Sequence, residues 1–123
     1  MKTTKIELLK YRGQNSTLFT GRPQGEMARN ELKLDEMDKE DGTINLVIPK
    51  GTTSFNPSFF LGLLYDSIKR LGLNNFTTKY IFIIEDDDEE IKKVINDNIE
   101  DGKRNALNSI DKKNIFDKFF FFA

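Results

Sequence analysis

Two short apolar runs, each of strand length and each followed by helical spacing, constrain this chain more than any other feature. The runs are TINLVIP (43–49) and KYIFII (79–84), and their apolar residues are successive rather than alternate. Continuous apolar runs are typical of strands buried on both faces in a parallel sheet. We therefore expect two buried strands of an α/β fold. The first should be central, covered on both faces, and should stop at Pro49, which has no amide hydrogen to donate.

Between the two runs, residues 57–72 have the pattern of an apolar helix. Asn56 is placed to cap it, Pro57 fits its first turn and Gly72 ends it. Its apolar stripe consists of Phe59, Phe60, Leu63, Leu64, Ile68 and Leu71.

Two more segments have helical spacing. GRPQGEMARNELKL (21–34) places small residues three or four positions apart, which predicts close packing, and an acidic connection over 35–42 follows it. The other segment follows EDDDEE (85–90) and repeats Ile or Val at helical spacing from Ile91 onward. Gly102 either interrupts this last helix or ends it and starts another.

The N-terminal stretch TKIELLKY (4–11) is predicted to be a strand, and a short extra strand is expected near 16–20. The order β, α, β, α, β, α predicts an α/β domain with a four- or five-stranded mixed sheet. Three or four helices should lie mainly on one face. We expect one domain over residues 1–110 and a Phe-rich C-terminal tail over residues 111–123.

Composition limits the chemistry that this chain can perform. It has neither His nor Cys among its 123 residues, so the usual neutral-pH base, the thiolate nucleophile and the commonest nitrogen metal ligand are all missing. We therefore expect a non-enzymatic protein with no cofactor. The missing cysteines fit a reducing cytoplasm.

Net charge and hydropathy limit the classes of partner that we expect. The net charge of −1 lacks the basic excess of a nucleic-acid-binding protein, so we expect no nucleic-acid partner. No apolar run is long enough for a membrane span, and the N-terminal residues lack the pattern of a secretory signal. We expect a cytoplasmic protein with no membrane partner.

The polar turn after the first apolar run is the leading candidate for recognition. In GTTSFNPSFFLGLL, residues Ser54, Asn56 and Ser58 lie at or beside a helix N-terminus. Backbone N–H groups and the helix dipole favour negative charge there, so a partner's acidic group or a phosphate on Ser54 or Ser58 would be tolerated. The alternative is that Asn56 caps the helix and the serines fill turn positions.

Two stretches resemble the STAS-like domains, a branch related to the bacterial anti-anti-sigma factors. SFNPSFFLGLL is similar to that branch's polar turn, Ser-Phe pair and apolar helix, and GRPQGEMARNEL is similar to its helix before the central strand. The resemblance spans about residues 18–84. It implies a STAS-like fold, a regulatory interaction role and an ATPase-fold kinase as partner. In the anti-anti-sigma factors the kinase modifies an Asp-Ser-Ser/Thr-Gly turn; here the matching TTSFNPS has neither that Asp nor that Gly.

A second candidate lies in GRPQGEMAR. Arg22 and Arg29 could offer guanidinium groups to a phosphate or carboxylate, while Gly25 allows close backbone approach. The spacing is not that of a nucleotide-binding loop. The alternative is an exposed ion pair between Arg29 and Glu26.

EDDDEE (85–90) concentrates carboxylates, but it lacks the spacing and glycine of a calcium-binding loop. Acidic residues are favoured at a helix start without any ion. We expect no metal site.

The C-terminal stretch NIFDKFFFFA needs a cover, because so many exposed phenylalanines would favour aggregation. An amphipathic helix or a short strand would suit it. Phe116, Phe119 and Phe120 are candidates for contact with the chain's own core, a second copy or another protein.

Taken together, these features favour a regulatory protein-interaction module of a bacterium or phage, binding a protein partner through residues 51–62, with Arg22 and Arg29 as a second contact. Phosphorylation could modulate it. The alternative is a small-ligand-binding protein or enzyme that holds a nucleotide or phosphate with Arg22 and Arg29. A third is a structural subunit assembled through the Phe-rich tail.

Overall fold

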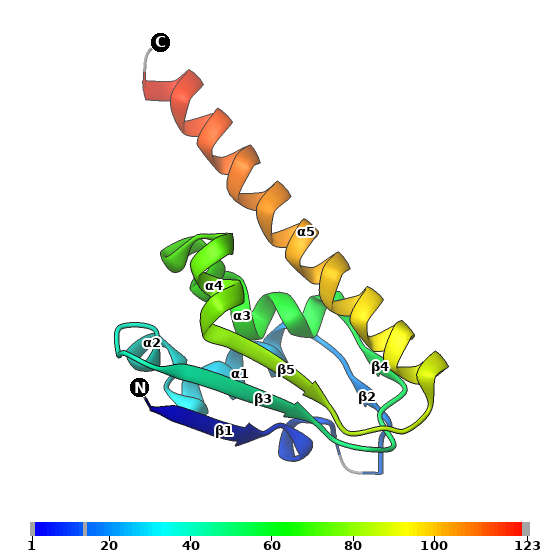
Figure 1. Ribbon diagram of the computed structural model, residues 1–123. Coiled ribbons are helices and arrows are strands. Elements are labelled where there is room, and N and C mark those ends of the chain that lie inside the picture. Colours follow the sequence, from blue (N-terminus) through cyan, green and yellow to red (C-terminus); the bar gives the residue numbers. More distant parts are fainter. Residues whose placement is uncertain (1, 14, 122–123) are drawn as a thin grey trace.

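The computed structural model describes residues 2–13 and 15–121, with side chains over 2–13 and 15–112. Short groups of strands and of helices follow one another along it (Figure 1). The strands are β1 (Thr3–Glu7), β2 (Leu18–Phe19), β3 (Thr43–Ile48), β4 (Ser54–Phe55) and β5 (Tyr80–Ile84). The helices are α1 (Arg22–Leu32), α2 (Leu34–Met37), α3 (Pro57–Leu71), α4 (Leu73–Lys79) and α5 (Glu89–Phe121).

The main sheet is parallel, in the order β1-β3-β5, so β3 is central as predicted. The mixed α/β class is confirmed, but the strands do not form one mixed sheet of four or five. β2 and β4 form a separate parallel pair. The reason lies at Pro49: without an amide hydrogen it ends the β3 ladder, and the chain becomes extended again at Ser54, beside Leu18.

The first strand is shorter than predicted. The ladder of β1 ends at Glu7, and the chain then forms a 3-10 turn over Leu9–Tyr11. Leu8, at the start of that turn, has helical backbone angles and a fully buried side chain. Its burial accounts for the apolar pattern that had extended the predicted strand.

The described helices all lie on one face of the main sheet (Figure 1). On β5, Tyr80, Phe82 and Ile84 are on the side of the core, whereas Ile81 and Ile83 are 42% and 36% exposed on the opposite face. The described helices therefore cover β3 on one face only, although Val47, on its other face, is fully buried. Its register neighbours on that face are Glu7 of β1 and Ile83 of β5.

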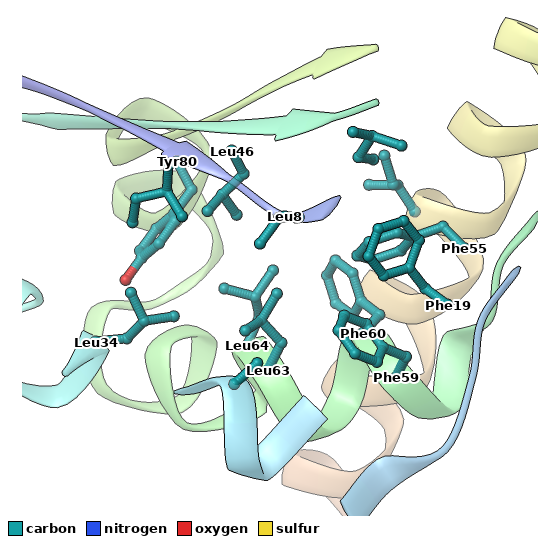
Figure 2. Packing of buried hydrophobic residues seen from close by; sticks show 14 of the residues in the cluster. Leu8, Phe19, Leu34, Leu46, Phe55, Phe59, Phe60, Leu63, Leu64 and Tyr80 are labelled. Carbon is teal, nitrogen blue, oxygen red and sulfur yellow. The ribbon is translucent and has the colours of Figure 1, made fainter. Parts of the chain in front are cut away.

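The core beneath the sheet is rich in aromatic rings (Figure 2). Phe19, Phe55 and Phe59 pack in a triangle, with ring centroids 5.2 to 5.3 Å apart. Phe82 of β5 meets Phe55 and also stacks on Phe60. Rings from β2, β4, α3 and β5 thus join the small strand pair to the helices and the main sheet.

Helix α3 crosses its neighbours at glycines. A Cβ on Gly25 of α1 would overlap the Phe59 carbonyl oxygen, and one on Gly62 of α3 would overlap the Arg22 carbonyl oxygen. The two helices therefore touch backbone to backbone. Helix α5 crosses α3 at Gly102, where a Cβ would overlap the ring of Phe60. The interior glycines of the helices thus serve packing.

Helix α5 runs without a break through Gly102 and past residue 110. The expected boundary between a domain over 1–110 and a tail over 111–123 therefore falls inside one helix, whose C-terminal part projects from the body in Figure 1. The side chains of Phe116, Phe119 and Phe120 lie outside the described residues. Within the described part of the chain, no helix combines the length and hydrophobicity of a membrane span.

The close crossing of α1 and α3 requires a residue without a side chain at position 62. Gly62→Ala should lower the free energy of unfolding by about 1–3 kcal/mol, the range for overpacked sites. The added methyl group would also lie 2.8 Å from the Glu26 amide nitrogen. Chemical denaturation measures the change. Asn30→Ala, on the exposed side of α1, is the matched control and should be neutral or slightly stabilising. A neutral Gly62→Ala would contradict the backbone contact.

Candidate functional site

The turn between β3 and α3, residues 51–58, is fixed by strand β2 on one side. Thr53 donates its amide to the Thr17 carbonyl at 2.8 Å, and Asn56 donates its amide to the Phe19 carbonyl at 2.9 Å. Below the turn, Phe55 is fully buried in the aromatic core. This turn, which we call the corner, is therefore held by backbone bonds above a rigid base.

Helix α5 holds the corner from the other side. The Asn98 side-chain oxygen accepts the Phe55 amide at 2.9 Å and the Ser54 hydroxyl at 3.5 Å. The free edge of β4 is thereby satisfied by a side chain instead of another strand. Sequence reasoning missed Asn98. Its only signal was a polar residue directly before the buried Ile99 of the helical stripe.

The corner ends in the capped N-terminus of α3. The Asn56 Oδ1 accepts the Ser58 amide at 2.8 Å, and Pro57 follows the cap, as predicted. The side chain of Ser58 is exposed, whereas Ser54 and Asn56 are half-buried. The structure therefore brings the three candidates together in one surface turn, with Asn56 as cap and Ser58 outermost.

Arg12 and an acidic loop support the corner at its start. Arg12 donates through Nη1 to the buried Thr52 hydroxyl at 3.0 Å and to the Lys50 carbonyl at 3.3 Å, while its buried Nε has no hydrogen-bond partner among the described residues. Asp86 accepts amide bonds, first from Asp88 and also from Gly51, which hold the pKa of its carboxyl below the ordinary value. The loop from β5 to α5 is thus tied to the corner.

The acidic run EDDDEE is occupied by local backbone bonds. Asp86 accepts the Asp88 amide at 3.0 Å, and Asp88 accepts the Glu90 amide at 2.9 Å at the start of α5. In these bonds the carboxylates stabilise the start of a helix, which is the alternative to a metal site that the sequence offered. Among the described residues, no group of carboxylates is arranged to hold a metal ion.

The second candidate lies in a shallow groove of about 240 Å³ between α1 and α3. Arg22 lies there, half exposed, above the Tyr65 ring at 5.5 Å, and pairs with Glu26 at 3.6 Å. Gly25 contributes the close helix crossing. Glu26 and Asp66 add negative charge to the same lining, so the groove does not present the uniformly basic surface that an anion would favour.

Arg29 is turned inward. Its Nε and Nη2 donate to Asp35 at 3.1 and 2.6 Å, its Nη2 also to Asp38 at 2.9 Å, and its Nη1 to the Leu63 carbonyl and the Ser67 hydroxyl at 2.9 and 2.8 Å. Burial lowers the pKa of the guanidinium, but the hydrogen bonds to Asp35 and Asp38 outweigh it and raise the pKa overall. Arg29 therefore pairs with these two carboxylates and not with Glu26, which pairs with Arg22.

Asp38 is the centre of a buried polar network that sequence reasoning missed. Its fully buried carboxylate accepts Tyr80 at 2.5 Å, Ser67 at 2.7 Å and Arg29 at 2.9 Å. Burial and the bond to Asp38 raise the pKa of Tyr80 far above its ordinary value. The network links α1, α3 and β5 at the end of the molecule away from the corner.

One sequence signal could have revealed this network. Ser67 falls inside the apolar stripe of α3, between Leu64 and Ile68, and a polar side chain there needs a buried partner. Asp38, in contrast, looked like one more residue of an acidic connection. Because the network is satisfied within the fold and buried, its chemistry is structural.

Comparison of the chain with models of protein families, with characterised proteins and with solved structures finds no match.

Breaking the network should destabilise the fold strongly. Asp38→Ala leaves Arg29, Ser67 and Tyr80 without their shared acceptor, and removal of one partner of a buried pair typically costs about 3–5 kcal/mol. Urea denaturation of the purified chain measures the loss. Asp66→Ala is the matched control: Asp66 is exposed and 3.8 Å from Arg29, so its loss should stay within about 1 kcal/mol. Equal effects of the two changes would contradict a structural network.

Asp35 should make part of the stability depend on acid pH. The hydrogen bond from Arg29 holds the pKa of Asp35 below its ordinary 3.8, so its contribution is present above about pH 4 and is lost as pH falls further. The stability gap between the wild type and Asp35→Asn should therefore shrink between pH 6 and pH 3. Denaturation at several pH values tests this, and a gap that widens toward acid would contradict it.

Proposed function

We propose that this chain is a regulatory protein-interaction module that binds a protein partner through residues 51–62. The observation that carries the proposal is the arrangement of the corner, where polar groups stand on a buried aromatic base. Phe55 and Phe59 are fully buried beneath it, and Ser58 is exposed above it. A surface held this firmly loses little conformational entropy on binding.

Surface recognition also fits what the other candidate sites offer. The groove between α1 and α3 is shallow and carries both signs of charge. The buried carboxylate of Asp38 is fully covered. Neither place gives a substrate access to an activated group, whereas the corner presents hydroxyl, amide and helix-terminal groups at the surface. The role of a protein-interaction module is therefore better supported than that of an enzyme.

A phosphate would be accommodated at Ser58 more readily than at Ser54. Ser58 lies in the first turn of α3, where the helix dipole favours negative charge, and its side chain is exposed. The Ser54 hydroxyl is half-buried and faces the Asn98 oxygen, which would repel a phosphate. If the module is regulated by phosphorylation, Ser58 is the site that we propose.

The resemblance to STAS-like domains gives the partner its class. An ATPase-fold kinase is the partner that such a module would meet, and the cytoplasm is where it would meet it. Arg22 remains available as a second contact, whereas the N–H groups of Arg29 are occupied by Asp35, Asp38, Leu63 and Ser67. That occupation reduces the support for a nucleotide or phosphate held jointly by Arg22 and Arg29.

Affinity capture from a lysate of the native host tests the proposed surface. The wild-type chain should retain a partner that Ser58→Glu loses or binds at least about tenfold more weakly. A like-charge contact at an interface costs several kcal/mol, and about 1.4 kcal/mol is already tenfold in affinity. Ser109→Glu, an exposed Ser on α5, is the matched control and should bind like the wild type. Identical capture by all three chains would place the partner elsewhere and refute a recognition site at the corner.

A further inference from the structure

Strand β5 is an edge strand of a kind that folded proteins do not usually leave open. Its sequence, YIFII, contains no charge, proline or glycine. One side of it pairs with β3, and no other strand in the described part of the chain pairs with it. Long apolar edges are normally blunted by charge, by proline or by a covering segment, because they attract further strands. This edge therefore needs a cover.

The backbone groups that would accept a new strand can be identified. Glu85 donates its amide to the Ile48 carbonyl on β3 at 2.9 Å, so the backbone groups of Ile81 and Ile83 also face β3. The groups of Phe82 and Ile84 alternate with these and point to the open edge. Among the described residues, no turn, loop or side-chain hydrogen bond engages the amides of Phe82 or Ile84, and the ladder parity turns both away from β3.

The open face of the sheet carries apolar side chains next to this edge. Ile81 and Ile83 are 42% and 36% exposed, and Val47 lies beside Ile83 in the register of the β3–β5 pair. The edge thus has both unpaired backbone groups and a strip of exposed isoleucine.

We propose that the β5 edge pairs antiparallel with β5 of a second copy, with Phe82 opposite Phe82 of that copy. In this register the outward groups of the two Phe82 residues bond each other, and each Ile84 amide reaches a Tyr80 carbonyl. Ile81 of each copy lies opposite Ile83 of the other, in the non-hydrogen-bonded pairs where side chains approach most closely. The exposed isoleucines therefore cover one another.

Charge complementarity selects a second copy over an unrelated strand. The same register places Lys79 of each copy opposite Glu85 of the other, at both ends of the paired strands. Lys79 already donates to the carbonyls of Glu40 and Gly42 at 2.6 and 3.1 Å, which leaves one of its three N–H groups for an exposed carboxylate. A two-fold axis through the Phe82 pair satisfies the backbone, apolar and charge terms at once, which is the mark of an isologous interface.

Engineered cysteines test the register, since the natural chain has none. Ile81→Cys and Ile83→Cys chains, mixed and left to exchange subunits under mild oxidation, should form a disulfide-linked dimer. Each variant alone should not, because identical positions lie roughly 8 Å apart in this register, beyond the reach of a disulfide of about 7 Å. Cross-linking of a single variant as readily as the mixture, or of neither, would refute the register.

Sedimentation of the full chain tests the dimer itself. The wild type should sediment at twice its 14.3 kDa mass. Ile81→Lys/Ile83→Lys should be monomeric, because Lys then opposes Lys, and Ile81→Lys/Ile83→Glu should recover the dimer because opposite charges meet. Circular dichroism checks that each variant is folded.

A monomeric wild type, or a dimer that survives Ile81→Lys/Ile83→Lys, would overturn the proposal. A dimer lost only in the full-length Phe116→Ser/Phe119→Ser/Phe120→Ser chain would assign assembly to the C-terminal segment instead. None of these three results would affect the corner, since the two surfaces share no residue.

Discussion

The backbone contact between α1 and α3 is the constraint on which the rest of this fold depends. Gly25 and Gly62 remove the side chains that would hold the helices apart. Arg29, on the next turn of α1, consequently reaches the Leu63 carbonyl and Ser67 on α3, and Asp38 completes the contact from the segment after α2. With larger residues at the crossing, the guanidinium would stop short of these acceptors and be buried unpaired, which is far costlier than the loss of one packing contact.

Helix α3 therefore has two ends with different tasks. The C-terminal half of α3 contains Ser67, which donates to Asp38 in the buried polar network. Its N-terminal turn, with Asn56 and Ser58, forms part of the corner. Because the network and the two glycine crossings fix the helix along its length, its N-terminus is a rigid platform. A protein partner bound there, as we propose, would meet the charge at the corner without any rearrangement of the core. Regulation by a phosphate would then act by direct attraction or repulsion at the interface.

Local signals made much of this fold predictable. Pro49 ends β3, and Asn56 and Gly72 cap α3, through preferences set by their own backbone chemistry. The apolar run Tyr80–Ile84 likewise predicted β5. β4 and α4 were missed. β4 is two residues long and exists because Leu18–Phe19 and Asn98 supply its partners, and α4 continues directly from the Gly72 that ends α3. The burial of Asp38 could not be predicted either, since partners distant in sequence decide whether a carboxylate lies in the core or at the surface.

The second face of the sheet shows the limit of pattern reading most clearly. Apolar residues on both sides of β3 and β5 would ordinarily mean helices on both sides, yet the described helices cover one. Val47 is shielded by its neighbours in the sheet, but Ile81 and Ile83 are not. Ile81 and Ile83 are apolar enough for a core, yet they lie beside an edge that no described strand covers. An interface with another chain explains them better than simple exposure to solvent. A sheet continued across two copies would keep every helix on one side and leave both corners accessible to a protein partner.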